Sequence, residues 1–167
     1  MILRCTKKLL VIIGPSSLAD PPPEPDPEDW YGNLLWSERR KCLLLTHSAT
    51  LFTIFEPDVA ASDLRATAGT VFGLIQRELR GEDLPPHTFG DHTGEQVLLA
   101  RTADRSVLGC MNDMAFICED TIRRSGGLSR TNISRLNRAL RRNINSARAY
   151  ERPIDLTLQR LGIEGRR

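Results

Sequence analysis

Asp104, Arg105 and Ser106 form a short polar turn between a strand expected at residues 96–101 and a helix expected at residues 106–124. Backbone N–H groups at the start of a helix attract anions, and an arginine with a serine hydroxyl would strengthen that attraction. Two interpretations stay open. Either the turn binds a phosphate-bearing ligand, or Ser106 caps the helix and Arg105 pairs with a nearby acid.

Asn112 and Asp113 interrupt the apolar pattern of the same helix one to two turns after its start. In a catalytic interpretation, Arg105 stabilises charge, Ser106 contacts a phosphate and Asp113 acts as acid or base, with all three lining one pocket. In a structural interpretation, Asn112 hydrogen-bonds a loop or strand, because a buried amide needs partners. The candidate binding residues of this region are Arg105, Ser106, Asn112 and Asp113.

A second candidate site is an arginine-rich helical face between residues 130 and 148. Its binding candidates are Arg135, Arg138 and Arg142. Residues 123–167 carry 12 arginines and 3 acids, a net charge of +9, whereas residues 1–122 carry −7. This face suits the phosphates of a nucleic acid, a protein partner, or the acidic half of the same chain. Aromatic residues that would stack on bases are nearly absent near it.

Two further groups of polar residues have spacings that do not support a site. His87, Asp91 and His92 share one loop, but zinc needs three or four converging ligands, so we predict an ordinary solvated loop. His47 and Ser48 are adjacent on a strand and point to opposite faces, which does not suit a nucleophile with its base. We predict no metal site and no cofactor.

The chain that must position these residues is 167 residues long, which suits a single domain over residues 1–167. Residues 15–29 are rich in proline and predict a surface loop, and residues 129–167 predict a basic helical part. The four cysteines lack metal-ligand spacing and are expected to be reduced and buried, as in a cytoplasmic protein. No apolar run approaches the roughly 18 residues of a membrane helix, so no membrane association is predicted.

Hydrophobic periodicity gives the order of the elements. Strands are predicted at residues 2–5, 32–37, 41–47, 51–55 and 96–101. Helices are predicted at residues 7–13, 62–80, 106–124, from 131 onward and at 153–161. The expected fold class is α+β, with a small antiparallel sheet of four to five strands and three to four helices packed mainly on one face.

Residues 101–113, Arg-Thr-Ala-Asp-Arg-Ser-Val-Leu-Gly-Cys-Met-Asn-Asp, resemble the signature of a family of small uncharacterised bacterial proteins. The opening Ile-x-Arg-Cys-Thr-Lys-Lys-Leu and a block from Asn33 to Phe52 look like further parts of that family in the same order. The resemblance covers most of the chain and implies one α+β domain of bacterial origin, without implying an activity. The proline-rich insert and the arginine-rich tail depart from the family pattern.

The sequence contains no glycine-rich phosphate loop, no G-x-S-x-G elbow and no H-E-x-x-H motif. We therefore predict a non-catalytic binding or regulatory module, whose partner is a protein or a nucleic acid. One alternative is an enzyme acting on a phosphate-bearing small molecule or a nucleic acid. Another is a component of a toxin–antitoxin or mobile-element system.

Overall fold

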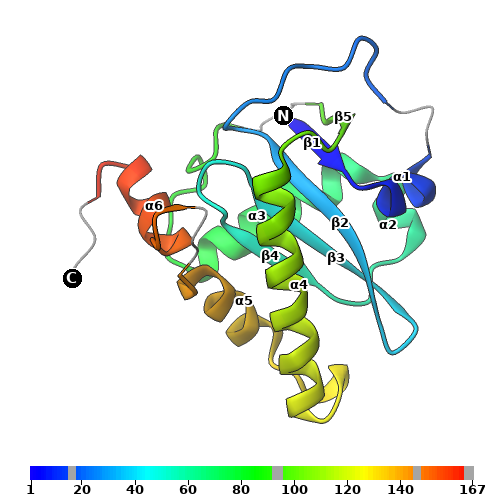
Figure 1. Ribbon diagram of the computed structural model, residues 1–167, viewed down its shortest axis with the longest axis vertical. Coiled ribbons are helices and arrows are strands. Elements are labelled where there is room, and N and C mark those ends of the chain that lie inside the picture. The colour runs from blue at the N-terminus through cyan, green and yellow to red at the C-terminus, as the bar shows by residue number, and fades with distance from the viewer. Residues whose placement is uncertain (15–17, 92–95, 145–147, 164–167) are drawn as a thin grey trace.

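The structure, a computed structural model, describes residues 1–14, 18–91, 96–144 and 148–163 (Figure 1). The strands are β1 (Ile2–Cys5), β2 (Trp30–Ser37), β3 (Arg40–His47), β4 (Thr53–Glu56) and β5 (Leu98–Arg101). The helices are α1 (Lys7–Ile13), α2 (Ala61–Arg65), α3 (Thr67–Gly81), α4 (Arg105–Ser125), η2 (Leu128–Arg130, a 3-10 helix), α5 (Ile133–Arg142) and α6 (Pro153–Arg160). The α+β class expected from the sequence is confirmed.

The five strands form one mixed sheet in the order β4–β3–β2–β1–β5. Strands β2, β3 and β4 are antiparallel neighbours, but β1 runs parallel to both β2 and β5. The prediction of an antiparallel sheet is therefore wrong for β1 and β5. Short connections imply antiparallel pairing only between the strands they join, whereas α1 and the proline-rich segment return the chain to start β2 beside β1 in the same direction.

Helices cover both faces of the sheet, so the predicted packing mainly on one face is also wrong (Figure 1). Helices α1, α2 and α3 bury their apolar side chains against one face, and α4 and α5 bury theirs against the other. Strand β3 explains this arrangement. Leu43 and Leu45 join the first cluster, while Cys42 and Leu44 join the second. An uninterrupted apolar run of this kind is typical of a strand buried on both sides.

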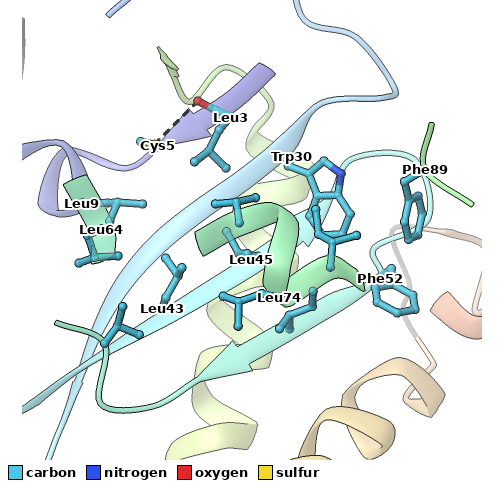
Figure 2. Close-up of a cluster of buried hydrophobic side chains, with 14 of the residues drawn as sticks. Leu3, Cys5, Leu9, Trp30, Leu43, Leu45, Phe52, Leu64, Leu74 and Phe89 are labelled. Atoms are coloured by element: carbon cyan, nitrogen blue, oxygen red, sulfur yellow. Dashed lines mark hydrogen bonds between the residues drawn. The ribbon is translucent and has the colours of Figure 1, made fainter. Parts of the chain in front are cut away.

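Figure 2 shows the cluster beneath α1, α2 and α3, in which Trp30, Phe52 and Phe89 lie at one end. Phe89 makes edge contacts with both other rings, each at a centroid distance of 5.2 Å. Gly32 on β2 lets α1 approach closely, since a Cβ atom there would lie 2.8 Å from a methyl group of Leu9. A side chain at this position would force the end of the Leu9 side chain to move.

Helix α4 crosses the opposite face and buries one apolar side along its length (Figure 1). The buried residues are Val107, Cys110, Met111, Met114, Cys118 and Ile122. Gly126 ends the helix with φ +82°, a left-handed conformation that glycine adopts without steric cost. The structure thus places the helix predicted at residues 106–124 against the centre of the sheet.

Two helices differ from their predicted extent. The helix expected at residues 62–80 is divided into α2 and α3, because Ala66 leaves the helical conformation with ψ +47°. Helix α5 begins after Asn132, whose side chain accepts a hydrogen bond from Arg135 N, and ends at Arg142. The basic segment predicted at residues 130–148 therefore extends beyond α5, and Ile144, two residues after the helix, is 60% exposed.

Candidate functional site

The polar turn before α4 is a helix cap formed by Asp104. Its Oδ1 accepts hydrogen bonds from Ser106 N at 2.7 Å and from Val107 N at 3.3 Å. The backbone N–H of Asp104 donates to Tyr31 Oη at 3.2 Å, which fixes the turn on the sheet. The prediction that Ser106 is the cap is wrong by two positions. A carboxylate from the chain already holds the N–H groups that would attract an external anion.

Arg105, Ser106, Asn112 and Asp113 are all exposed on α4. Arg105 and Asp113 are eight residues apart, which corresponds to about 12 Å along a helix axis. The helix therefore does not bring the acid–base candidate next to the arginine, as the catalytic interpretation requires. Asn112 faces solvent instead of the loop or strand that its structural interpretation expected.

Beneath this turn lies a buried ion pair that the sequence interpretation missed. Arg4 Nε is 2.5 Å from Asp29 Oδ2, and both side chains are 3% exposed. Arg4 also donates to the carbonyl oxygens of Pro23 at 2.9 Å and Arg101 at 3.3 Å. The pair joins β1 to the end of β5 and to the proline-rich segment. An arginine between two apolar strand residues was the available signal, because a buried guanidinium requires an acidic partner.

A second missed cluster surrounds His47, which is fully buried against the rings of Trp30 and Phe89. Burial lowers the pKa of His47, because the charged imidazolium loses its hydration. The His47 ring and Arg160 lower the pKa of Glu28 to about 2. His47 Nε2 lies 3.9 Å from Glu28 Oε2, which is beyond hydrogen-bonding range. The bidentate ion pair with Arg160 therefore stabilises the ionised Glu28 carboxylate more than His47 does. This cluster fastens α6 to the body of the protein.

Part of the arginine-rich face of α5 has a structural role, because it covers the edge of the sheet formed by β4. Asn137 Oδ1 accepts from Phe55 N at 2.7 Å, and Asn137 Nδ2 donates to Phe55 O at 3.1 Å. Arg141 Nη1 lies 3.4 Å from Thr53 O on the same strand. Both side chains are buried, and they occupy the outward-facing backbone groups of edge strand β4. An uncovered edge would offer those groups to another chain.

Arg141 and Arg142 are neutralised by acids of α3 and the residue after it. Arg141 Nη1 is 2.9 Å from Glu78 Oε2, and its Nη2 is 2.8 Å from Glu82 Oε1. The guanidinium carbon also lies 4.8 Å from the ring centre of Phe52. Arg142 Nη2 is 2.6 Å from Glu82 Oε2, so this predicted binding residue already has a carboxylate partner. Some of the positive charge of residues 123–167 is therefore neutralised by acids of residues 1–122.

The acidity of Glu82 reflects this pairing. Burial, the largest single influence, opposes ionisation of the Glu82 carboxyl. The hydrogen bonds and charges of Arg142 and Arg141 together outweigh burial and lower the pKa of Glu82. Glu82 is consequently ionised at neutral pH and compensates both arginines.

Arg135 and Arg138 lie in a groove of about 460 Å³ between α3 and α5. The groove is lined by Arg77, Glu78, Gly81, Asn132, Ser134, Arg135, Arg138 and Arg141. Arg138 Nη2 donates to Gly81 O at 2.6 Å, a contact that orients the guanidinium without neutralising it. In the described part of the chain, no carboxylate lies within ion-pair distance of Arg135 or Arg138. Two of the three predicted arginines thus remain uncompensated in one groove.

Metal and membrane sites receive no support from the described residues. His87 and Asp91 are exposed, and His92 lies outside the described residues. Within residues 1–14, 18–91, 96–144 and 148–163, no three His, Cys, Asp or Glu side chains converge as metal ligands would. None of the helices in those ranges has the length and apolar character needed to cross a bilayer.

Comparison with known proteins places the chain in one family. No curated protein and no solved structure matches the sequence. The model of a domain of unknown function, DUF6933, matches residues 2–156, a span that includes the α4 cap, the α3–α5 groove and the sealed edge of β4. The chain therefore belongs to the DUF6933 family.

Proposed function

We propose that this protein is a non-catalytic binding module that holds an anionic partner in the groove between α3 and α5. The observation that carries the proposal is the pair of uncompensated guanidinium groups, Arg135 and Arg138, in a groove whose other charges are paired. Two cations on adjacent turns of one helix attract an anion together, whereas isolated surface arginines are largely screened by salt.

The paired charges of the groove make it stable without a ligand. Glu78 contacts Arg141 through Oε2 and Arg77 through Oε1, so both of its oxygens are occupied. Arg77 also holds Glu56 at 2.5 Å. The one acid that lines the groove therefore adds little repulsion, and an incoming anion does not have to displace an internal ion pair from Arg135.

The state of the cysteines supports a cytoplasmic location for this binding role. None of the four forms a disulfide, and all four are buried. Burial raises the pKa of Cys5 and of Cys118 to about 12, which makes both thiols unreactive. Unlinked, protected thiols suit a reducing compartment.

Retention on two chemically different polyanions, immobilised heparin and poly-L-glutamate, tests the proposal. A double variant, Arg135→Ala with Arg138→Ala, is compared with a matched control, Arg123→Ala with Arg124→Ala, which removes the same charge from exposed positions on α4. We expect the groove variant to elute at lower salt than the wild type on at least one matrix, and the control to elute near the wild type. Equal elution of the two variants on both matrices would contradict the proposed function.

A further inference from the structure

The groove between α3 and α5 offers a particular set of hydrogen-bond donors. Arg135 and Arg138 supply guanidinium N–H groups, Ser134 supplies a hydroxyl and Asn132 supplies an amide. The start of α5 adds the partial positive charge of a helix N-terminus, and Asn132 fixes this turn by accepting from Arg135 N at 2.9 Å. Arginine, serine, asparagine and helix N-termini are the groups that contact phosphate oxygens in nucleic-acid complexes.

The groove also lacks a surface on which bases stack. None of its eight lining residues is aromatic, so it offers no surface on which bases could stack. Its only acid, Glu78, is engaged by Arg77 and Arg141 and is not free to accept from a base amino group. The lining therefore favours charge contacts with phosphates over stacking of bases or packing of an apolar side chain.

The two uncompensated arginines of the groove lie next to each other on α5. Arg135 and Arg138 are three residues apart, which gives about 4.5 Å of rise along α5. Arg138 is oriented by Gly81 O at 2.6 Å, and Arg141 is fixed below it in the buried ion pair with Glu78. The two arginines are therefore neighbours on one helix, and the Arg138 guanidinium is already oriented before a ligand binds.

We propose that the groove binds the sugar–phosphate backbone of a nucleic acid without reading its sequence, with Arg135 and Arg138 each neutralising one phosphate. This inference rests on the proposed function and names the partner. Binding of this type releases one counterion for each phosphate neutralised, so the logarithm of the association constant falls linearly with the logarithm of salt concentration.

The salt dependence of binding to a fluorescently labelled mixed-sequence DNA duplex tests the inference. We expect Arg135→Ala and Arg138→Ala each to reduce the magnitude of the slope by about 0.9, and the double variant by about 1.8. The Arg123→Ala with Arg124→Ala control should keep the wild-type slope, and a second duplex of unrelated sequence should bind equally. Circular dichroism and thermal unfolding confirm that each variant is folded.

Several results would overturn the inference and leave the proposed function standing. These are a wild-type slope retained by both single variants, a strong preference for one duplex, or binding of inorganic pyrophosphate or poly-L-glutamate in the groove without binding of DNA. The last result would identify a small phosphate compound or an acidic protein as the partner. Loss of retention on every polyanion in the control variant alone would refute the proposed function itself.

Discussion

Replacing Asn137 by leucine tests how the edge of the sheet is sealed. The side chain is fully buried and makes two hydrogen bonds to Phe55, one to the backbone N–H and one to the carbonyl oxygen. Leucine has a similar size but neither a donor nor an acceptor. The substitution leaves both backbone groups of Phe55 without these partners in a place from which α5 excludes water.

The expected loss of stability follows from those two groups. Each buried backbone group without a partner costs about 1–3 kcal/mol, and removing the amide's own desolvation cost offsets part of that. We expect the free energy of unfolding to fall by about 2–4 kcal/mol, a large share of the roughly 5–15 kcal/mol typical of a domain. Urea denaturation followed by circular dichroism measures it as a lower midpoint with an unchanged m-value.

The control is the same substitution at Asn112, which is exposed on α4. Asn112→Leu should change the free energy of unfolding by less than about 0.5 kcal/mol. If Asn137→Leu also stays within that range, the reasoning is refuted, and the apolar residues of α5 alone hold the helix on β4.

Three further predictions follow from buried charges and thiols. Arg141→Met leaves Glu78 and Glu82 without their buried partner and should lower the free energy of unfolding by about 3–5 kcal/mol in urea denaturation, whereas a change below about 1 kcal/mol would show that the pair is dispensable. The pKa of Glu28 is lowered to about 2 in the folded protein from an ordinary value of 4.5, so its contribution to stability is fully present above pH 4.5 and is lost as the pH falls toward 2. Glu28→Gln should therefore lower the melting temperature at pH 7 and have progressively less effect below pH 4.5, and an effect of equal size at pH 3 would contradict this assignment. The four buried cysteines should react with a thiol reagent at native pH far more slowly than after denaturation in guanidinium, and rapid labelling of the folded protein would contradict their burial.

Local sequence patterns were sufficient for most of the elements. The helix predicted at residues 106–124 from hydrophobic periodicity agrees with α4 to within one residue at each end. Such patterns are reliable because the period of a helix or strand is set by backbone geometry, and its apolar positions follow that period wherever the element packs. The two-sided run on β3 also contained the signal for helices on both faces, which the prediction of packing mainly on one face did not use.

Local sequence patterns could not predict that β1 runs parallel to its neighbours β2 and β5. Strand pairing depends on how the chain between two strands travels, and the segment from α1 to Asp29 returns to the same end of the sheet before β2 begins. The apolar residues of β1 fit a parallel or an antiparallel neighbour equally well. The position of the strand in the sheet was therefore decided by long-range packing.

The candidate site also separates what local sequence predicts from what long-range packing decides. The sequence by itself determined that residues 130–148 are basic and that a helix starts near residue 131, because composition and period are properties of neighbouring residues. Only the tertiary structure decided that Arg141 is buried against Glu78, that Arg142 is neutralised by Glu82, and that Arg135 and Arg138 remain free in the groove. The physical reason is that the charge an arginine presents depends on which acids the fold brings to it, and these acids are about 60 residues away along the chain.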